Sequence, residues 1–349
     1  MEYVNLGKSG LKVSRIGLGC MSFGVKQRTW FLNEADSRPL IRRALEHGIN
    51  YFDTADIYGN GESEQVLGRA LKDFARRDEV VIATKIFYPM RPDPNGRGLS
   101  RKAILTGIDA SLHRLGTDFV DLYQIHRWDD ETPIEETLDA LHEVVKMGKV
   151  RYIGASSMMA WQFCEALHRA DRYGWTRFVS MQPHYNLLNR EEEREMLPLC
   201  RAEGIGVLPW SPLARGRLAR AWDAPPSSSR VANDKTAERL YSNTVDVDKN
   251  VIYAVSEIAQ ARGISQVQVA LAWLLQQPAV SAPIVGVTKP FHLEDAVGAL
   301  AIRLEPVECA NLERYYVPHA VSFIRSGAHD LSLASHAAPI APAQHRPFV

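Results

Sequence analysis

The stretch FDTADIYGNGESEQVLG (residues 52–68) combines the end of an apolar strand, two polar side chains and the start of an amphipathic helix. Asp53 ends the strand, Tyr58 follows five residues later, and Val66 and Leu67 begin an apolar stripe. Buried or half-buried polar groups cost free energy unless they are paired. A strand that ends in an acid and a phenol therefore indicates a functional site at the junction between this strand and the helix.

The alternation of strand and helix recurs along the chain. Stripes such as Ile104, Ile108, Leu112 and Leu115 predict helices between the apolar runs, so each run is expected to be the strand of a βα unit. Eight such units, joined by right-handed crossovers, predict a single (β/α)8 TIM barrel, and a doubly wound open sheet is the alternative. The expected strands are IGLGCM (16–21), INYFD (49–53), VVIATK (80–85), FVDLYQIH (119–126), RYIGAS (151–156), FVSMQ (178–182), GVLPW (206–210) and APIVG (282–286).

Several segments depart from this regular alternation. MEYVNLGKSGLKVS (1–14) predicts an N-terminal β-hairpin that caps the bottom of the barrel. TPIE (132–135) predicts a helix start with Thr132 as the N-cap. A long loop or lid is expected over 215–250, before helices resume near Val251, since structureless loops of this length are usually functional. The barrel domain is expected over 1–325, followed by a disordered tail over 326–349.

Composition and charge indicate an ordinary globular protein. The 349 residues are 46% hydrophobic and 23% charged, and 41 basic residues balance 41 acidic ones. No global basic field attracts nucleic acid or an anionic membrane surface. No run of 18 apolar residues and no signal peptide is visible, and the cysteines (20, 164, 200 and 309) form no C-x-x-C pair. We therefore expect a cytoplasmic protein in a reducing compartment, with no metal site.

Polar and aromatic side chains follow most of the expected strands at their carboxyl ends. Each has a structural explanation when it is considered alone, for example as a surface lysine or a helix cap. In a (β/α)8 barrel, however, the carboxyl ends of all strands lie on one face, where catalytic groups gather. The residues that this arrangement predicts to meet are Asp53, Lys85, His126, Ser156, Ser157, Gln182, Trp210 and Ser211.

The motifs that carry these residues resemble a known family. FDTADIYG, VVIATK, LYQIH, YIGASS and LPWSPLARGRL are similar to motifs of the aldo-keto reductase superfamily, over residues 1 to about 320. The nearest branch is the bacterial YajO-type, aryl-alcohol-dehydrogenase-like reductases. The resemblance implies NADPH-dependent reduction of small carbonyl compounds such as aryl aldehydes. It also implies that Asp53, Tyr58, Lys85 and His126 are the catalytic residues.

The chemistry of these four side chains suits that reaction. A carbonyl that accepts hydride becomes an alkoxide, so the site must supply a proton or a strong hydrogen bond. Tyr58 is the natural acid, and a nearby Lys85 ammonium lowers the pKa of a phenol, which is about 10 when free. Asp53 is expected to keep Lys85 charged, and His126 to orient the substrate or relay the proton.

The resemblance also implies a set of coenzyme contacts. Trp210 corresponds to the aromatic residue that stacks on the nicotinamide, and Thr288 and Lys289 correspond to the 2'-phosphate site, which favours NADPH over NADH. Two positions depart from the family pattern: His292 stands where Gln or Arg is usual, and Ala296 stands where Asn is common. These departures are compatible with some use of NADH. The other expected contacts are Ser156, Ser157 and Gln182 to the carboxamide, Gly19, Cys20 and Met21 beneath the nicotinamide, Ser211, Leu213, Arg215 and Gly216 near the pyrophosphate, and Gly286, His292 and Asp295 near the adenosine.

Aromatic residues near the catalytic positions predict a substrate pocket for aryl aldehydes or small ketones. Trp30, Tyr88 and Trp128 are the candidates, with Phe31 and Phe87 beside them, and loop packing is the structural alternative. Arg127 could attract an anionic substrate, although a solvated surface arginine is the simpler interpretation. The sequence does not indicate an oligomeric interface.

Three other interpretations compete with the reductase. GLGCMSFG (17–24) is close to a dinucleotide fingerprint, but its glycine spacing does not fit, and Gly17 and Gly19 more simply mark a crowded first strand. A barrel aldolase with Lys85 as the Schiff-base nucleophile leaves Tyr58 and Trp210 without a role. A regulatory subunit similar to potassium-channel β-subunits would bind the coenzyme with little turnover.

Overall fold

Eight parallel strands form the centre of the molecule in the computed structural model, which describes residues 1–24, 30–224 and 234–319. Their order is β10-β3-β4-β5-β6-β7-β8-β9. Ser281 N and Ile284 N donate to Val207 O and Pro209 O, both at 2.9 Å, and thereby join the two edges of the sheet. The predicted barrel is confirmed, and the open sheet is excluded. The strands are β3 (Gly17–Gly19), β4 (Tyr51–Asp53), β5 (Val81–Ile86), β6 (Val120–Ile125), β7 (Val150–Ser156), β8 (Phe178–Gln182), β9 (Gly206–Val207) and β10 (Ile284–Gly286).

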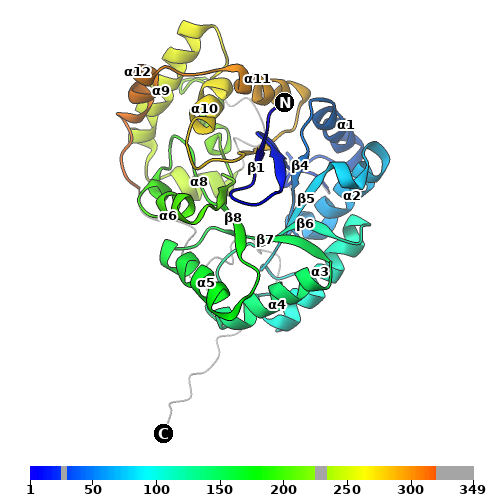
Figure 1. Cartoon of the computed structure of the whole chain (residues 1–349). Coiled ribbons are helices and arrows are strands. Elements are labelled where there is room, and N and C mark those ends of the chain that lie inside the picture. Colours follow the sequence, from blue (N-terminus) through cyan, green and yellow to red (C-terminus); the bar gives the residue numbers. More distant parts are fainter. Residues whose placement is uncertain (25–29, 225–233, 320–349) are drawn as a thin grey trace.

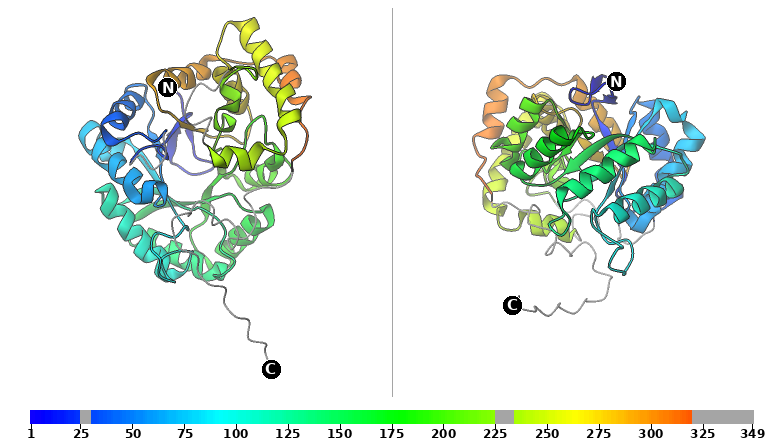
Figure 2. Two further views of the ribbon diagram at one scale, coloured as in Figure 1. Left: turned by 180° about the vertical axis from the view of Figure 1, so that it is seen from behind. Right: turned by 60° about the horizontal axis from the view of Figure 1, so that its bottom comes forward.

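Helices surround the barrel as an outer layer (Figure 1 and Figure 2). Their inward faces are the predicted apolar stripes: Val66 and Leu67 of α2, and Ile104 and Ile108 of α3, are all buried. This burial against the sheet is the main source of stability for helices of this length. The helices are α1 (Glu34–Glu46), α2 (Glu62–Phe74), α3 (Arg101–Leu115), α4 (Ile134–Lys146), α5 (Ala160–Tyr173), α6 (Met196–Glu203), α8 (Lys235–Tyr241), α9 (Val245–Arg262), α10 (Gln266–Leu275), α11 (Pro290–Gly298) and α12 (Pro306–Glu313).

An N-terminal hairpin closes one end of the barrel, as predicted. Strands β1 (Tyr3–Asn5) and β2 (Lys12–Ser14) pair antiparallel and lie across the barrel in Figure 1. Leu6 and Val13 are fully buried and belong to one apolar cluster with Tyr51 and Val81, the first residues of β4 and β5. The hairpin therefore fills the amino ends of the strands and leaves the carboxyl ends for a functional site.

The glycines of the first barrel strand are explained by crowding. A Cβ atom at Gly17 would lie 2.4 Å from the Tyr51 ring, which is closer than packed atoms allow. The pair Gly17 and Gly19 therefore lets β3 approach its neighbours inside the barrel, and the dinucleotide-fingerprint interpretation is not needed.

Two local expectations differ from the structure. Among the described residues, helix α8 begins at Lys235, well before Val251, and Asp234 caps it by accepting from the amides of Thr236 and Ala237. Thr132 does not cap α4: its hydroxyl donates to Asp129 at 2.8 Å, and Pro133 is the cap residue. Residues 225–233 of the predicted long loop (215–250) and the predicted tail (326–349) lie outside the described residues.

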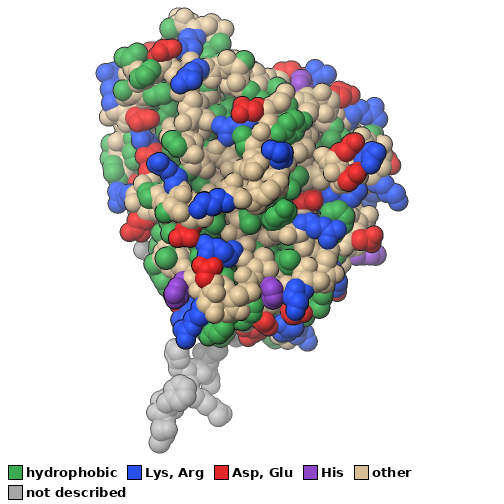
Figure 3. All heavy atoms as spheres, in the orientation of Figure 1, with side chains coloured by type: hydrophobic (Ala, Val, Ile, Leu, Met, Phe, Trp, Pro, Cys, Tyr) green, Lys and Arg blue, Asp and Glu red, His purple; other side chains and the backbone are tan. Residues whose placement is uncertain are grey.

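The surface around the hairpin carries mixed charge. Acidic and basic side chains are interspersed over the face shown in Figure 3. All four cysteines are free thiols. In the described part of the chain, no helix is long and apolar enough to cross a bilayer.

Candidate active site

A cavity of about 760 Å³ lies at the carboxyl ends of the strands, and this volume is in the range typical of small-molecule sites. Its wall brings together residues from all along the chain, as the barrel predicts. The predicted site residues that line it are Gly19, Met21, Trp30, Asp53, Tyr58, Tyr88, His126, Ser156, Gln182, Trp210, Ser211, Leu213, Arg215, Gly216, Gly286, Thr288, Lys289, His292 and Asp295.

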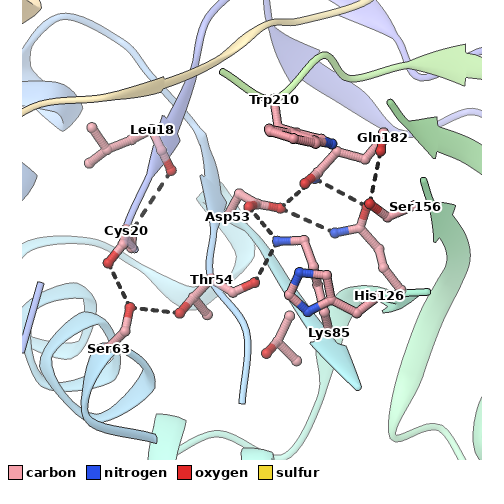
Figure 4. A network of polar contacts seen from close by, with 12 residues as sticks. Leu18, Cys20, Asp53, Thr54, Ser63, Lys85, His126, Ser156, Gln182 and Trp210 are labelled. Carbon is pink, nitrogen blue, oxygen red and sulfur yellow. Dashed lines mark hydrogen bonds and ion pairs between the residues drawn. The ribbon is translucent and has the colours of Figure 1, made fainter. Parts of the chain in front are cut away.

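A buried ion pair lies beneath this cavity (Figure 4). Lys85 Nζ is 2.5 Å from Asp53 Oδ1 and also donates to Thr54 O at 2.9 Å. The Lys85 side chain is fully buried and that of Asp53 is 3% exposed, so neither charge is screened by solvent. Burial alone would lower the pKa of Lys85, but Asp53 and Tyr58 outweigh it and raise the pKa above its usual value. Lys85 is therefore an ammonium at neutral pH.

Asp53 is held by more partners than the sequence predicted. Its Oδ2 accepts from Gln182 Nε2 at 2.8 Å, from Gln124 Nε2 at 3.1 Å and from the Tyr51 hydroxyl at 3.4 Å. The sequence motifs did not identify Gln124, which is fully buried. Its position two residues before His126 is a signal for a site residue, because alternate residues of a strand share one face. Since the amide nitrogen of Gln182 is bound to Asp53, its carbonyl oxygen is the atom that can accept from a ligand.

Tyr58 lies close to the ion pair and lines the cavity. The Lys85 Nζ is 5.1 Å from the centroid of the Tyr58 ring. Burial raises the pKa of the Tyr58 hydroxyl, and Lys85 opposes this rise only in part. The expected lowering of the phenol pKa by Lys85 is therefore present as a component, but the net direction is opposite, because removing the phenolate from water costs more than the ammonium restores. Tyr58 is protonated and able to donate.

His126 lies between two phenols on the cavity wall. Its ring centroid is 5.8 Å from that of Tyr58 and 4.9 Å from that of Tyr88, with edge-to-face geometry in both pairs. Burial, Arg127 and Lys85 together hold the pKa of His126 well below its usual value, so the imidazole is neutral at pH 7. Among the described residues its buried Nδ1 has no hydrogen-bond partner. A buried polar atom of this kind, in a residue that lines a cavity, fits a site for a polar ligand.

Trp210 presents an aromatic surface to the cavity. Its Nε1 donates to Ser157 Oγ at 2.9 Å, which fixes the edge of the indole. Ser156 lines the cavity and donates to Gln182 O at 2.8 Å. Ser157 was expected to contact the ligand directly, but it does not line the cavity. Its hydroxyl instead accepts from the indole and holds Trp210 in place.

The loop after Trp210 has an unusual backbone. Ser211, Ala214 and Arg215 have positive φ values of 50°, 46° and 55°. Such conformations cost about 1–3 kcal/mol each in residues other than glycine and cluster at functional sites. Arg215 is further fixed by an ion pair with Asp234, with Nε and Oδ2 2.7 Å apart. This rigid, strained loop forms the wall where a pyrophosphate was expected.

The start of α11 also lines the cavity. Lys289 is the N-cap residue of this helix, and His292 Nδ1 accepts from the Thr288 amide at 3.2 Å. A helix N-terminus combined with a lysine is favourable for an anion. The residues predicted for a 2'-phosphate therefore lie together, with His292 organising the turn.

Besides Ser157, two predicted contact residues lie outside the cavity lining. Cys20 is fully buried and its thiol points to Leu18 O, 3.7 Å away (Figure 4), so burial among core groups removes it from the cavity. Trp128 packs towards Trp161 of α5, with ring centroids 6.3 Å apart. Both expectations are corrected: neither side chain faces the cavity.

Arg127 is a residue that sequence reasoning underestimated. It was expected to be solvated, yet it is half-buried and lines the cavity. Its Nη1 donates to His126 O at 2.6 Å, and its guanidinium lies 5.8 Å from the Tyr88 ring centroid. The side chain thus folds back over the strand end and adds positive charge beside the two phenols.

Comparison with known proteins shows the family of the chain. The model of the aldo/keto reductase family matches residues 15–316 of the chain. The chain belongs to the aldo/keto reductase family. Its (β/α)8 barrel and its class as an oxidoreductase, both implied by the sequence motifs, are confirmed.

Several fungal aldo/keto reductases are similar over nearly their whole length. Versiconal hemiacetal acetate reductase of Aspergillus parasiticus is 46% identical over 341 residues, which cover 92% of this chain and 98% of the relative. An aldo-keto reductase of Metarhizium robertsii is 41% identical over 345 residues, covering 92% of each chain. A Saccharomyces cerevisiae protein with the provisional name aryl-alcohol dehydrogenase is 40% identical over 339 residues, 91% of this chain and 98% of the relative.

The geometry also opposes the barrel-aldolase interpretation. A Schiff-base nucleophile must be an accessible, neutral amine, whereas Lys85 is fully buried, paired with Asp53 and protonated. Within residues 1–24, 30–224 and 234–319, no group of three or more His, Cys, Asp or Glu side chains could hold a metal ion.

Proposed function

We propose that this aldo/keto reductase uses NADPH to reduce the carbonyl group of aldehydes or ketones, with aryl aldehydes as the favoured class. The observation that carries the proposal is the position of Tyr58 and His126 on the cavity wall, directly beside the buried pair of Lys85 and Asp53. The phenol is protonated, the imidazole is neutral, and the ammonium beneath them is permanent.

Each side chain has one role in this proposal. NADPH, when bound, supplies a hydride to the carbonyl carbon. Tyr58 donates its proton to the carbonyl oxygen as negative charge develops there, and Lys85 stabilises the resulting phenolate. Asp53 holds Lys85 charged and in position. His126, which is neutral, orients the carbonyl oxygen between itself and Tyr58.

The coenzyme assignment has its own support. An aromatic platform (Trp210), residues of a strained loop (211–216) and a cationic helix start (Lys289) all line the cavity, and in chemistry they match the nicotinamide, pyrophosphate and 2'-phosphate of NADPH. The hydroxyl of Ser156 and the side-chain carbonyl oxygen of Gln182 are the groups proposed to bind the carboxamide. Trp30 and Tyr88 are proposed to flank an aromatic substrate.

The decisive experiment is to follow NADPH absorbance with 4-nitrobenzaldehyde and the purified protein. Consumption of NADPH that depends on the aldehyde would support the reductase. Tight NADPH binding without consumption across a panel of aldehydes and ketones would favour the regulatory alternative that resembles channel β-subunits. Absence of NADPH binding would overturn the proposal.

Lys289→Ala is expected to reduce the preference for NADPH over NADH. Removing a cation that pairs with a phosphate costs about 1.5–3 kcal/mol, which is roughly a 10- to 100-fold loss in affinity for NADPH alone. Dissociation constants for both coenzymes, measured by fluorescence titration, test this. Lys102→Ala, at an exposed lysine of α3, is the control. An unchanged ratio in Lys289→Ala would show that the 2'-phosphate lies elsewhere.

Arg127→Gln is expected to reduce the discrimination in favour of anionic substrates. Because Arg127 lines the cavity beside His126, it attracts a carboxylate on the aromatic ring of a substrate. The ratio of kcat/KM for 4-carboxybenzaldehyde to that for 4-nitrobenzaldehyde should fall about tenfold, since one charged hydrogen bond contributes at least that factor. Arg201→Gln, on the exposed face of α6, should leave the ratio unchanged. The same ratio in both variants would contradict the assignment.

A further inference from the structure

The indole of Trp210 is supported from behind by a second aromatic ring. Trp210 lines the cavity, and His184 stacks on it with a centroid separation of 4.2 Å and an interplanar angle of 12°. The backbones of the same two residues form a parallel bridge beyond β8 and β9. One face of the indole is thus covered by His184, and Trp210 also lines the cavity.

His184 is held in turn by two polar side chains. Its Nε2 lies 2.8 Å from the Tyr241 hydroxyl and 3.2 Å from Asn186 Nδ2. Asn186 Nδ2 also donates to Ser211 O at 3.0 Å, which ties this group to the residue after Trp210. His184, Asn186 and Tyr241 are called the backing cluster below.

The backing cluster is uncharged. Burial lowers the pKa of His184 to about 3, and burial raises the pKa of Tyr241. Both side chains are therefore neutral across the physiological range. Because an oxidised nicotinamide ring is cationic, a neutral support behind the indole avoids the repulsion that an imidazolium would cause at short range.

Helix α8 connects the backing cluster with the loop after Trp210. Tyr241 is its last residue and is 1% exposed. Asp234, its N-cap, forms the ion pair with Arg215. The side chain of Arg215 is 6% exposed and that of Asp234 is 1% exposed. The two ends of one short helix thus fix two parts of the cavity wall, the aromatic platform and the strained loop.

We propose that the backing cluster positions the Trp210 indole for stacking on a nicotinamide ring, and that α8 fixes the cluster through Tyr241. His184 and Tyr241 act through Trp210 and are positioning residues. The inference rests on the proposed function, because it requires a nicotinamide coenzyme in this cavity. It adds residues from two segments, 184–186 and 234–241, to which the sequence motifs assigned no role.

The test compares Tyr241→Phe and His184→Gln with the wild type by measuring two dissociation constants. NADPH contacts the platform, whereas 2'-phosphoadenosine diphosphate ribose has the same adenosine and pyrophosphate but no nicotinamide. Tyr241→Phe should weaken NADPH binding about fivefold, the equivalent of one hydrogen bond, and His184→Gln should weaken it more, because the stacked ring is lost. Binding of the truncated ligand should not change. Tyr253→Phe is the matched control: Tyr253 lies on α9, and the substitution removes an exposed hydroxyl that is hydrogen-bonded to Asp223.

The outcomes separate positioning from general loosening. Selective loss of NADPH affinity, with unchanged affinity for the truncated ligand, supports the inference. Equal weakening of both ligands, or unchanged NADPH affinity in both variants, overturns it. If the wild type binds the truncated ligand but gains nothing from the nicotinamide, the inference fails while a nucleotide site remains. If the wild type binds neither ligand, the proposed function fails as well.

Discussion

Tyr58→Phe is expected to lower kcat/KM for 4-nitrobenzaldehyde by about 10²- to 10⁴-fold, the range typical of a lost general acid. Tyr58 lines the cavity, and the centroid of its ring is 5.1 Å from Lys85 Nζ. The substitution removes only the hydroxyl, which carries the proton that the alkoxide needs. The ring remains, so the affinity for NADPH should change less than about threefold. Stopped-flow or steady-state absorbance of NADPH gives the rate, and fluorescence titration gives the affinity.

Tyr88→Phe is the matched control for this experiment. Tyr88 lines the same cavity and contacts His126 edge-on, with centroids 4.9 Å apart, as Tyr58 does at 5.8 Å. Only Tyr58 has Lys85 beside its ring among the cation–ring contacts of the described residues. If Tyr88→Phe lost activity and Tyr58→Phe kept it, the proton donor would have been assigned to the wrong phenol.

The sequence predicted the fold because its signals were periodic and repeated. Eight apolar runs and the stripes between them specify where strands and helices lie, and a closed parallel barrel follows from the connections. The same topology predicted which residues meet, since Asp53, Lys85 and His126 lie at or next to the carboxyl ends of the adjacent strands β4, β5 and β6. Those predictions depended on strand register alone, which a period of two fixes well.

Predictions that depended on the direction of loop side chains were less successful. Trp128 and Arg127 follow His126 directly, yet Arg127 folds over the cavity and Trp128 turns towards Trp161. Thr132 was expected to cap a helix but bonds to Asp129, a competition that the short motif does not reveal. No local pattern specifies these choices, because each is decided by contacts with residues distant in sequence or by a neighbouring polar group.

The polar partners of the buried ion pair were also invisible at the level of single motifs. Tyr51 of β4 and Gln124 of β6 are fully buried strand residues, and each adds a hydrogen bond to Asp53. Such bonds are required because an unpaired buried carboxylate is costly. The need for additional donors could have been anticipated, but their identity depends on the shear of the closed barrel, which places β4 and β6 within reach.

Lys85→Met is expected to destabilise the folded protein by about 3–5 kcal/mol, because it leaves a buried charge without its counter-ion. Asp53 is 3% exposed, and the two glutamine amides that remain beside it are neutral donors. The free energy of unfolding, from urea titrations at pH 7 followed by both fluorescence and circular dichroism, measures this loss. Coincident transitions are required before the two-state analysis is applied.

The double variant Asp53→Asn with Lys85→Met separates this cost from the loss of packing. It removes both charges and keeps similar volumes, so it should be more stable than Lys85→Met alone, since replacing a whole buried pair is often nearly neutral. All of these variants should lack reductase activity, because Tyr58 loses the cation that stabilises its phenolate. Equal or lower stability of the double variant would contradict the view that an unpaired Asp53 is what destabilises Lys85→Met, and the proposed role of the pair would then have to be abandoned.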